Sequence, residues 1–216
     1  MMKDINNIIL LGLAGSRGIG VANEDSDYDY RGIYLPSARD ILLGNKDENF
    51  SFTKEDCDTT IYNFRHCLKL LKNSNFSMLE LLAMPKYEII TPLGRKLKDN
   101  FNLFVSTSTV SNQFKGTARG FLFRKGGNER KKYFHAWRVL FCGIRLFDSG
   151  VMKLDHPEFK KYAEKSAEEL KVLYEELLEE FSDAEHYSVL PLTINTEAID
   201  DFIVDVYTDI VKRGVK

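Results

Sequence analysis

The 216-residue chain has few cysteines and no long apolar run. Its three cysteines, Cys57, Cys67 and Cys142, are odd in number and contain no C-x-x-C pair, so we expect reduced thiols in a cytoplasmic protein. The longest apolar run, near residues 8–13, is about half a dozen residues long, far below the roughly 20 that span a bilayer. A secretory signal pattern is also missing from the start of the sequence, so we expect neither secretion nor a membrane partner.

Histidine is equally scarce, with four in the chain. His66, His156 and His186 lie at no metal-ligand spacing from one another or from a cysteine, so a zinc site is not expected. What the chain does contain is 44% hydrophobic and 12% aromatic residues, which excludes an intrinsically disordered chain and predicts a substantial core.

The net charge of -2 is the sum of two oppositely charged segments. Residues 113–145 carry nine basic residues against one acid, a net of +8, and aromatic residues are interleaved among them. Residues 155–185 carry eleven acids against four lysines, a net of -7. The basic segment suits a phosphate-rich partner. The alternative is that these cations lie on solvated helix faces and pair with the acidic segment.

Before about residue 95, short strands alternate with short helices. We expect strands at residues 6–13, 26–35 and 57–62, and helices at residues 63–72 and 78–83. The first of these helices has an apolar face that should point inward, formed by Phe64, Cys67, Leu68 and Leu71.

After about residue 95 the pattern becomes helical. It predicts helices over residues 104–124, 129–147, 158–181 and 196–213, with Trp137, Phe141 and Ile144 as core residues of the second. The expected fold is therefore α+β, with a small mixed β-sheet in a core at residues 1–98 and an all-helical domain at residues 99–216.

A glycine-rich turn, Gly-Ser-Arg-Gly-Ile-Gly, follows the first predicted strand at residues 15–20. It is close to the phosphate-binding turn of short-chain dehydrogenases. However, the first glycine of that pattern would fall on Ala14, and a polar turn follows where a long helix should run. No tyrosine is followed by a lysine four residues later, so the catalytic pair of that family is also missing, and a dehydrogenase is disfavoured.

The second predicted strand carries Asp27 and Asp29 on one face. Two acids at this spacing can bind one divalent ion, or two ions ~4 Å apart, because their Cβ vectors are parallel. Hard oxygen ligands select Mg²⁺ or Mn²⁺, which hold nucleotide phosphates in proteins. Gly15 would let the backbone approach a triphosphate, and Ser16 and the turn N–H groups would donate to its oxygens.

Gly-Ser followed after ten residues by Asp-x-Asp resembles the nucleotidyltransferase superfamily typified by DNA polymerase beta. The whole segment 15–34 is similar to the opening of the RNA-ligase-associated family within it. The similarity continues through Leu-Glu-Leu-Leu at residues 79–82 and Lys-x-x-His-x-x-Arg at residues 132–138, over roughly residues 8–155. One departure is Asn75-Phe76, where Asn-Pro is expected. The resemblance implies that the small mixed sheet is a nucleotidyltransferase core.

The resemblance also implies a Mg²⁺- or Mn²⁺-dependent transfer of an NMP from an NTP to a hydroxyl acceptor, with release of pyrophosphate. Asp27, Asp29 and a third carboxylate on a later strand would be the catalytic and metal-binding residues. Asp58 is the candidate for the third, with Asp56 as the fallback. The alternative for Asp58 is an exposed acid at the start of a strand.

Nucleotide binding is expected from two places. Gly15, Ser16 and Arg17 would bind the triphosphate from the turn. Three further residues share a helix face about 120° wide and would add their polar groups: Lys132, His135 and Arg138. The alternative is that the histidine is an interfacial residue and the cations lie on the surface. Glu80 either has a functional role or is a helix acid that pairs with a neighbour.

The association of the resembled family with RNA ligase suggests an RNA end, or another nucleic acid, as the acceptor. Two alternatives remain open. One is AMP transfer to a protein hydroxyl, as in smaller antitoxin-type relatives. The other is a non-catalytic nucleic-acid-binding module that uses the basic segment and ignores Mg²⁺.

Overall fold

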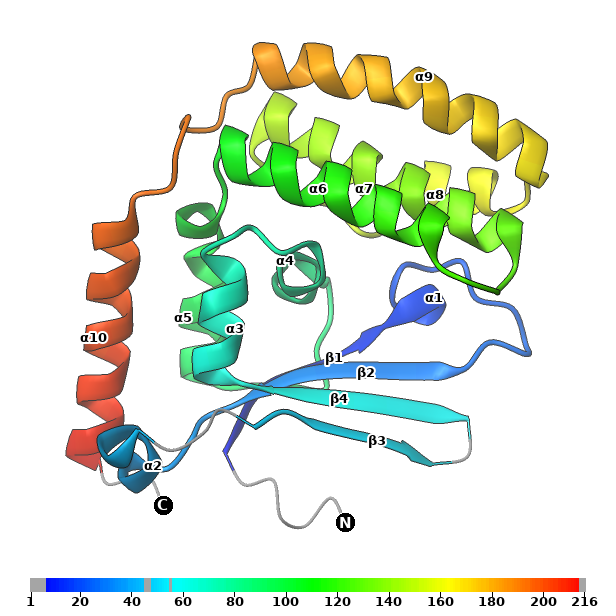
Figure 1. The fold of residues 1–216 in the computed structure, drawn as a ribbon. Coiled ribbons are helices and arrows are strands. Elements are labelled where there is room, and N and C mark those ends of the chain that lie inside the picture. The colour runs from blue at the N-terminus through cyan, green and yellow to red at the C-terminus, as the bar shows by residue number, and fades with distance from the viewer. Residues whose placement is uncertain (1–6, 45–47, 55, 214–216) are drawn as a thin grey trace.

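The computed structural model describes residues 7–44, 48–54 and 56–213, and it confirms a mixed sheet followed by helices (Figure 1). The sheet has five strands in the order β3-β4-β2-β1-β5. Their bounds are β1 Ile8–Ala14, β2 Tyr28–Tyr34, β3 Phe50–Lys54, β4 Cys57–Asn63 and β5 Ile89–Ile90.

The strand pairing brings distant parts of the sequence into register. β1 runs antiparallel to both β2 and β5, β3 runs antiparallel to β4, and the central pair β2 and β4 is parallel. In this register Asp29 lies beside Ala14 of β1 on one side and beside Asp58 of β4 on the other. β1 is rich in Leu and Ile, and most of its residues are buried.

Short helices cover one face of the sheet, as Figure 1 shows for α3, α4 and α5. The predicted inward face of α3 is confirmed, because all four of its apolar residues are buried. Asn63 and Asn75 cap α3 and α4 by accepting hydrogen bonds from the backbone N–H groups of Arg65 and Met78. The short helices are α1 Gly15–Gly18, α2 Ala38–Leu43, α3 Phe64–Leu71, α4 Phe76–Ala83, α5 Pro92–Asp99 and a 3₁₀ turn, Phe101–Phe104.

The later helices are α6 Thr107–Phe123, α7 Glu129–Ser149, α8 Pro157–Ala163, α9 Ala167–His186 and α10 Thr196–Arg213. α7 packs against both α6 and α9, and these three helices are called the bundle below (Figure 1). The single helix expected at residues 158–181 is wrong, because α8 ends and α9 begins within it. Ser166 starts α9 through a capping box, in which its hydroxyl and the carboxylate of Glu169 each accept the other's backbone N–H.

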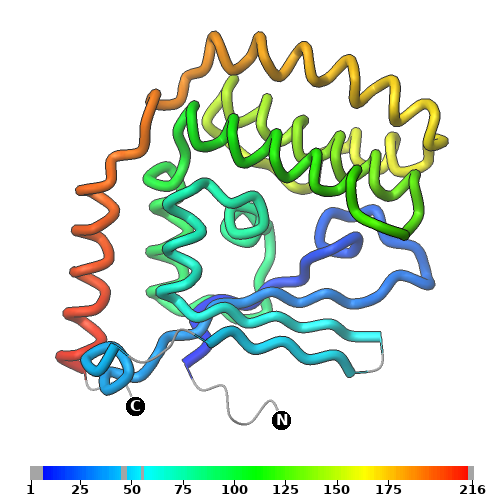
Figure 2. The backbone as a smooth tube through the Cα atoms, viewed as in Figure 1, coloured from blue at the N-terminus to red at the C-terminus, as the bar shows by residue number. Residues whose placement is uncertain are grey.

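α10 returns to the first half of the chain, as the tube in Figure 2 shows. Its Phe202 ring lies 6.3 Å from that of Phe104, and its Asp200 pairs with Lys72. One cluster of buried apolar residues runs through both halves. The division into residues 1–98 and 99–216 stays a prediction.

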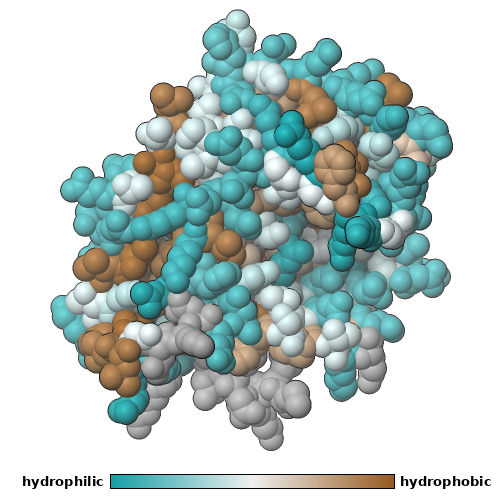
Figure 3. Space-filling view, in the orientation of Figure 1, coloured by the Kyte–Doolittle hydropathy of each residue, from teal (hydrophilic) through white to brown (hydrophobic). Residues whose placement is uncertain are grey.

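The face shown in Figure 3 is mostly hydrophilic over the bundle, and its hydrophobic side chains gather along α10 and the segment that leads to it. Exposed apolar residues in these parts of the chain include Val189, Leu192 and Val204. None of the described helices is both long enough and apolar enough to cross a membrane.

Candidate active site

β1 turns sharply into α1 at Gly15, next to a carboxylate. Gly15 has a φ of +60°, and a Cβ at this position would lie 1.9 Å from Oδ2 of Asp29. A Cβ at Gly18 would lie 2.2 Å from the carbonyl oxygen of Leu13. Both positions therefore require glycine for this close approach, and the first also requires it for a left-handed backbone. The result is a turn whose backbone lies directly against Asp29.

Three acids share the edge of the sheet beside this turn. Asp29 and Asp58 are register neighbours on β2 and β4, and the exposed Asp27 directly precedes β2. Burial raises the pKa of Asp29 above its ordinary value; Arg31 opposes this shift, while the negative charges of Asp58 and Asp27 add to it. The negative charges of Asp58 and Asp27 therefore act on the carboxyl group of Asp29.

Within the part of the chain that the structure describes, no group of three His, Cys, Asp or Glu side chains is arranged to hold a metal ion. Mg²⁺ in nucleotide sites commonly takes one or two carboxylates, together with substrate phosphates and waters. Asp29 and Asp58 lie side by side and supply hard oxygens, which matches this smaller ligand number. The donor set fits Mg²⁺ or Mn²⁺ bound together with a nucleotide.

Arg17 in α1 holds the loop that precedes β2. Its Nε and one terminal nitrogen donate hydrogen bonds to the carbonyl oxygen of Ser26, at 3.0 and 2.7 Å. Its guanidinium carbon also lies 4.0 Å from the centre of the Tyr28 ring. These contacts fix the residues on both sides of Asp27 relative to the glycine turn.

Glu80 of α4 is buried between two arginines from other elements. One carboxylate oxygen accepts a hydrogen bond from Arg31 of β2 at 2.8 Å, and the other pairs with Arg138 of α7. Burial alone would raise the pKa of Glu80, but Arg138 and Arg31 outweigh it and leave this pKa below its ordinary value. The bridge links the strand that carries Asp29 to the bundle.

The residues of the Lys-x-x-His-x-x-Arg motif have different surroundings. Arg138 is buried against Glu80, so its charge is already neutralised. The His135 ring stacks on Phe121 with centroids 5.1 Å apart. Burial and the charge of Arg138 lower the pKa of His135 to about 4, so its imidazole is neutral at physiological pH. Lys132 is half-buried, and no described acid forms an ion pair with it.

α8 contributes a cation that the sequence did not predict. Lys160 is exposed, and its Cε would lie 3.7 Å from a Cβ placed on Gly20, the last glycine of the turn. Lys160 and Gly20 are far apart in the sequence, so no local pattern around Lys160 indicated this proximity.

The predicted site residues are therefore brought together in part. Gly15, Asp27, Asp29 and Asp58 meet at one edge of the sheet, whereas Arg138 is connected to it only through Glu80 and Arg31. Arg31 was outside the predicted set, although it lies two residues after Asp29 and shares its face of the strand. The catalytic and binding roles of all these residues remain predictions.

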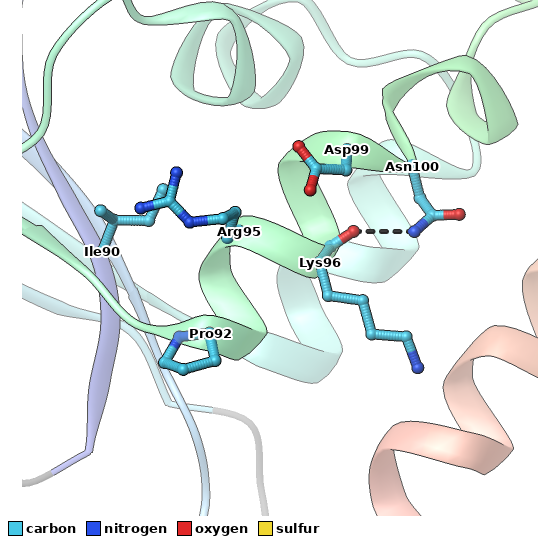
Figure 4. Close-up of a pocket in the computed structure, with 6 residues that line it drawn as sticks. All are labelled: Ile90, Pro92, Arg95, Lys96, Asp99 and Asn100. Carbon is cyan, nitrogen blue, oxygen red and sulfur yellow. Dashed lines mark hydrogen bonds between the residues drawn. The ribbon is translucent and has the colours of Figure 1, made fainter.

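A pocket of about 500 Å³ lies beside β5 and α5, and none of the predicted site residues lines it (Figure 4). Most of its lining comes from α5, where the Asn100 amide donates a 2.8 Å hydrogen bond to the carbonyl oxygen of Lys96. The lining residues are Ile90, Pro92, Arg95, Lys96, Asp99 and Asn100. This pocket is separate from the edge of the sheet that carries Asp27, Asp29 and Asp58, which is called the carboxylate edge below.

The model of the RNA repair pathway DNA polymerase beta family matches residues 2–205. An uncharacterized 38.9 kDa protein from the nrdC-mobD intergenic region of Enterobacteria phage T4 is 28% identical over 110 residues, which is 45% of this chain and 33% of that protein. The chain thus covers about a third of the curated relative that it matches. A solved nucleotidyltransferase-like protein from Exiguobacterium sibiricum 255-15 aligns with 94% of this chain and 75% of its own, at 14% identity and a TM-score of 0.33.

Proposed function

Because this chain belongs to the RNA repair pathway DNA polymerase beta family, we propose that it transfers a nucleoside monophosphate from an NTP to a hydroxyl acceptor and releases pyrophosphate. The observation that carries the proposal is the contact between the Gly15 turn and Asp29, with Asp58 in register beside it. A phosphate-binding turn and a pair of metal-binding carboxylates are the two parts that phosphoryl transfer needs side by side.

In the proposed site, the N–H groups of the turn and the hydroxyl of Ser16 donate to the triphosphate oxygens, and Gly15 lets the turn lie against the carboxylate of Asp29. Asp29 and Asp58 hold Mg²⁺ or Mn²⁺, with Asp27 beside them. Such an ion, when bound, neutralises phosphate oxygens and lowers the pKa of an attacking hydroxyl.

Positive charge is proposed to come from several elements. Arg17 keeps the loop before β2 closed against the turn. Lys132 and Lys160 add cations from the helical half, and Lys160 lies next to the last glycine of the turn. His135 is neutral and takes part as a hydrogen-bonding and stacking group rather than as a cation. Arg138 acts through Glu80.

We propose an RNA end as the acceptor, since the family description names RNA repair and the bundle offers a suitable surface. This surface, called the α6–α7 tip, carries Phe123, which is 82% exposed, and four exposed cations for which the described residues provide no ion-pair partner. Single-stranded nucleic acids bind to such surfaces by stacking bases on aromatic rings and placing phosphates on cations. The four cations are Arg119, Arg124, Lys125 and Lys131.

The experiment offers each of the four NTPs, labelled on the α-phosphate, to the protein with Mg²⁺ and either a mixed RNA pool or a protein lysate. Resolving the products by size gives the acceptor, the NTP preference and the number of nucleotides added. We expect label on RNA from the wild type and from the surface control Asp201→Asn, and none from Asp29→Asn. Label on lysate proteins alone would replace RNA with a protein acceptor. Equal labelling by Asp29→Asn and wild type would contradict the proposed site.

A further inference from the structure

We propose that Arg31 binds the phosphates of the nucleotide and that the buried Glu80 holds it in position, an inference that rests on the proposed function. The motivating feature is the bridge from Arg31 through Glu80 to Arg138, which joins β2, α4 and α7. Arg31 would be a substrate-binding residue and Glu80 a positioning residue.

The placement of Arg31 suits this role. It follows Asp29 by two residues on β2, so both side chains leave the same face of the sheet, about 7 Å apart along the strand. Its pairing partner on β1 is Gly12, three residues before the glycine turn begins at Gly15. Arg31 therefore lies on the same strand face as Asp29, two residues further along β2.

Exposure distinguishes the two arginines that share Glu80. The side chain of Arg31 is 29% exposed, whereas those of Arg138 and Glu80 are 6% and 5% exposed. A charge as deeply buried as that of Arg138 requires a neutralising partner, so Glu80 is committed to it. Arg31 thus retains a positive charge that Glu80 does not fully balance.

The hydrogen bonding of Arg31 leaves donors for a ligand. One terminal nitrogen donates to Glu80, and a guanidinium carries five N–H donors in a planar fork. Because one side of this fork is fixed by a buried carboxylate, the remaining donors are held in a set direction. This arrangement favours two-pronged binding of phosphate oxygens, for which arginine is better suited than lysine.

Two simpler explanations make different predictions. Arg31 and Glu80 could serve only to join α4 and α7 to the sheet, in which case their loss would lower stability without changing nucleotide affinity. Arg31 could instead serve only to offset the charge of Asp29, in which case removing it would strengthen the binding of Mg²⁺ to the carboxylates. The proposal predicts weaker NTP binding in both the Arg31 and the Glu80 variants.

The test measures the dissociation constants of ATP, GTP, CTP and UTP with Mg²⁺ by calorimetry, together with the thermal midpoint of each protein. We expect Arg31→Gln to weaken binding of the preferred NTP about tenfold or more, with Arg31→Lys in between, since one charge-assisted hydrogen bond or more is lost. Glu80→Gln keeps the shape but loses the charge, and should raise KM by a larger factor than it lowers kcat.

The matched control is Lys115→Gln. Lys115 is 30% exposed and pairs with Glu185 at 2.7 Å between α6 and α9. The variant therefore also loses an ion pair of a partly exposed cation, but at a position outside the predicted site. Its NTP affinity should equal that of the wild type. If Arg31→Gln binds the NTP as tightly as the wild type does, the inference is overturned and the proposed function stands. If the wild type binds none of the four NTPs, the proposed function fails together with the inference.

Discussion

The carboxylate edge of the sheet and the bundle handle charge in opposite ways. At the edge, Asp29 lies half-buried beside another acid, and Glu80 is buried between two arginines. In the bundle the core is apolar and aromatic, with Phe147 and Phe181 in contact, and most charged groups lie on the surface. Buried charge lowers stability unless it is well paired, and an apolar core raises it. Partly or fully buried charge is thus a feature of the edge and of the Glu80 bridge beside it, whereas apolar packing is the main feature of the bundle.

Two glycines show the same contrast. Gly15 makes room for a carboxylate, whereas Gly143 of α7 makes room for a ring, since a Cβ there would lie 2.4 Å from Cε2 of Phe181. The first close approach brings a turn to a polar group, and the second allows two helices to pack. Replacing Gly15 should therefore affect transfer activity, and replacing Gly143 should affect stability.

The largest expected effect is the loss of transfer activity in Asp29→Asn. We expect a fall of about a thousandfold, equivalent to ~4 kcal/mol, because the carboxylate is needed to hold the ion and the nucleotide. Stability should be unchanged or higher, since the raised pKa of Asp29 means that its ionised form is disfavoured in the folded protein. Initial rates and thermal melts, with Asp201→Asn as the control, measure both. A strongly destabilised variant would contradict the contrast between the two regions.

The next effect is on stability, in Glu80→Ala. This change leaves Arg138 buried without its partner and should lower the free energy of unfolding by ~3–5 kcal/mol. The comparable change in the bundle, Glu185→Ala, removes a partly exposed pair and should cost less than ~1 kcal/mol. Urea denaturation of both variants gives the two values. Equal losses would mean that the buried bridge is no more important for folding than a surface pair.

The two glycines provide a third comparison. Gly143→Ala should overpack the contact with Phe181 and lower the free energy of unfolding by ~1–3 kcal/mol, while leaving nucleotidyl transfer near the wild-type rate. Gly15→Ala should abolish most transfer, because the methyl group occupies the position of the Asp29 carboxylate. Activity and denaturation assays on the pair would refute the contrast if the two variants lost the same property.

A smaller effect should appear on acidification. The pKa of His135 in the folded protein is about 4, below its ordinary 6.5, so the unfolded chain takes up a proton more readily. The contribution of the neutral His135 to the free energy of unfolding is complete above about pH 6.5 and is lost as the pH falls towards 4. By pH 5 the loss amounts to ~2 kcal/mol. The charges near it are Arg138, Glu80, Lys131 and Arg31.

Urea denaturation at pH 7.5 and pH 5 measures this contribution. The loss of stability between the two pH values should be smaller in His135→Gln than in the wild type, whereas the exposed His186→Gln should behave like the wild type. An equal loss in all three proteins would mean that His135 is not kept neutral by its surroundings.

Strong periodicity made much of the fold predictable. The inward face of α3 and the bounds of α10 follow from apolar spacing and end signals in the sequence. β5 is too short, at two residues, to show any alternation. α5 was not predicted either, although Thr91 caps it and Pro92 opens it, a start signal that was available in the sequence.

The candidate site was predictable where its parts are close in sequence. Gly15 and Asp29 lie on consecutive elements, and the family match confirms the resemblance that their spacing suggested. The bridge around Glu80 was not predictable, because its partners are 49 and 58 residues away. Which arginine a buried acid selects depends on helix packing, and no local pattern encodes it.

The most direct test of the central claim uses two labelled forms of the preferred NTP with Mg²⁺ and the RNA acceptor. If the carboxylate edge performs nucleotidyl transfer, label on the α-phosphate will appear on the acceptor, label on the γ-phosphate will appear only in pyrophosphate, and Asp29→Asn will give neither product. Transfer of the γ-phosphate to the acceptor, or unchanged products with Asp29→Asn, would contradict the account.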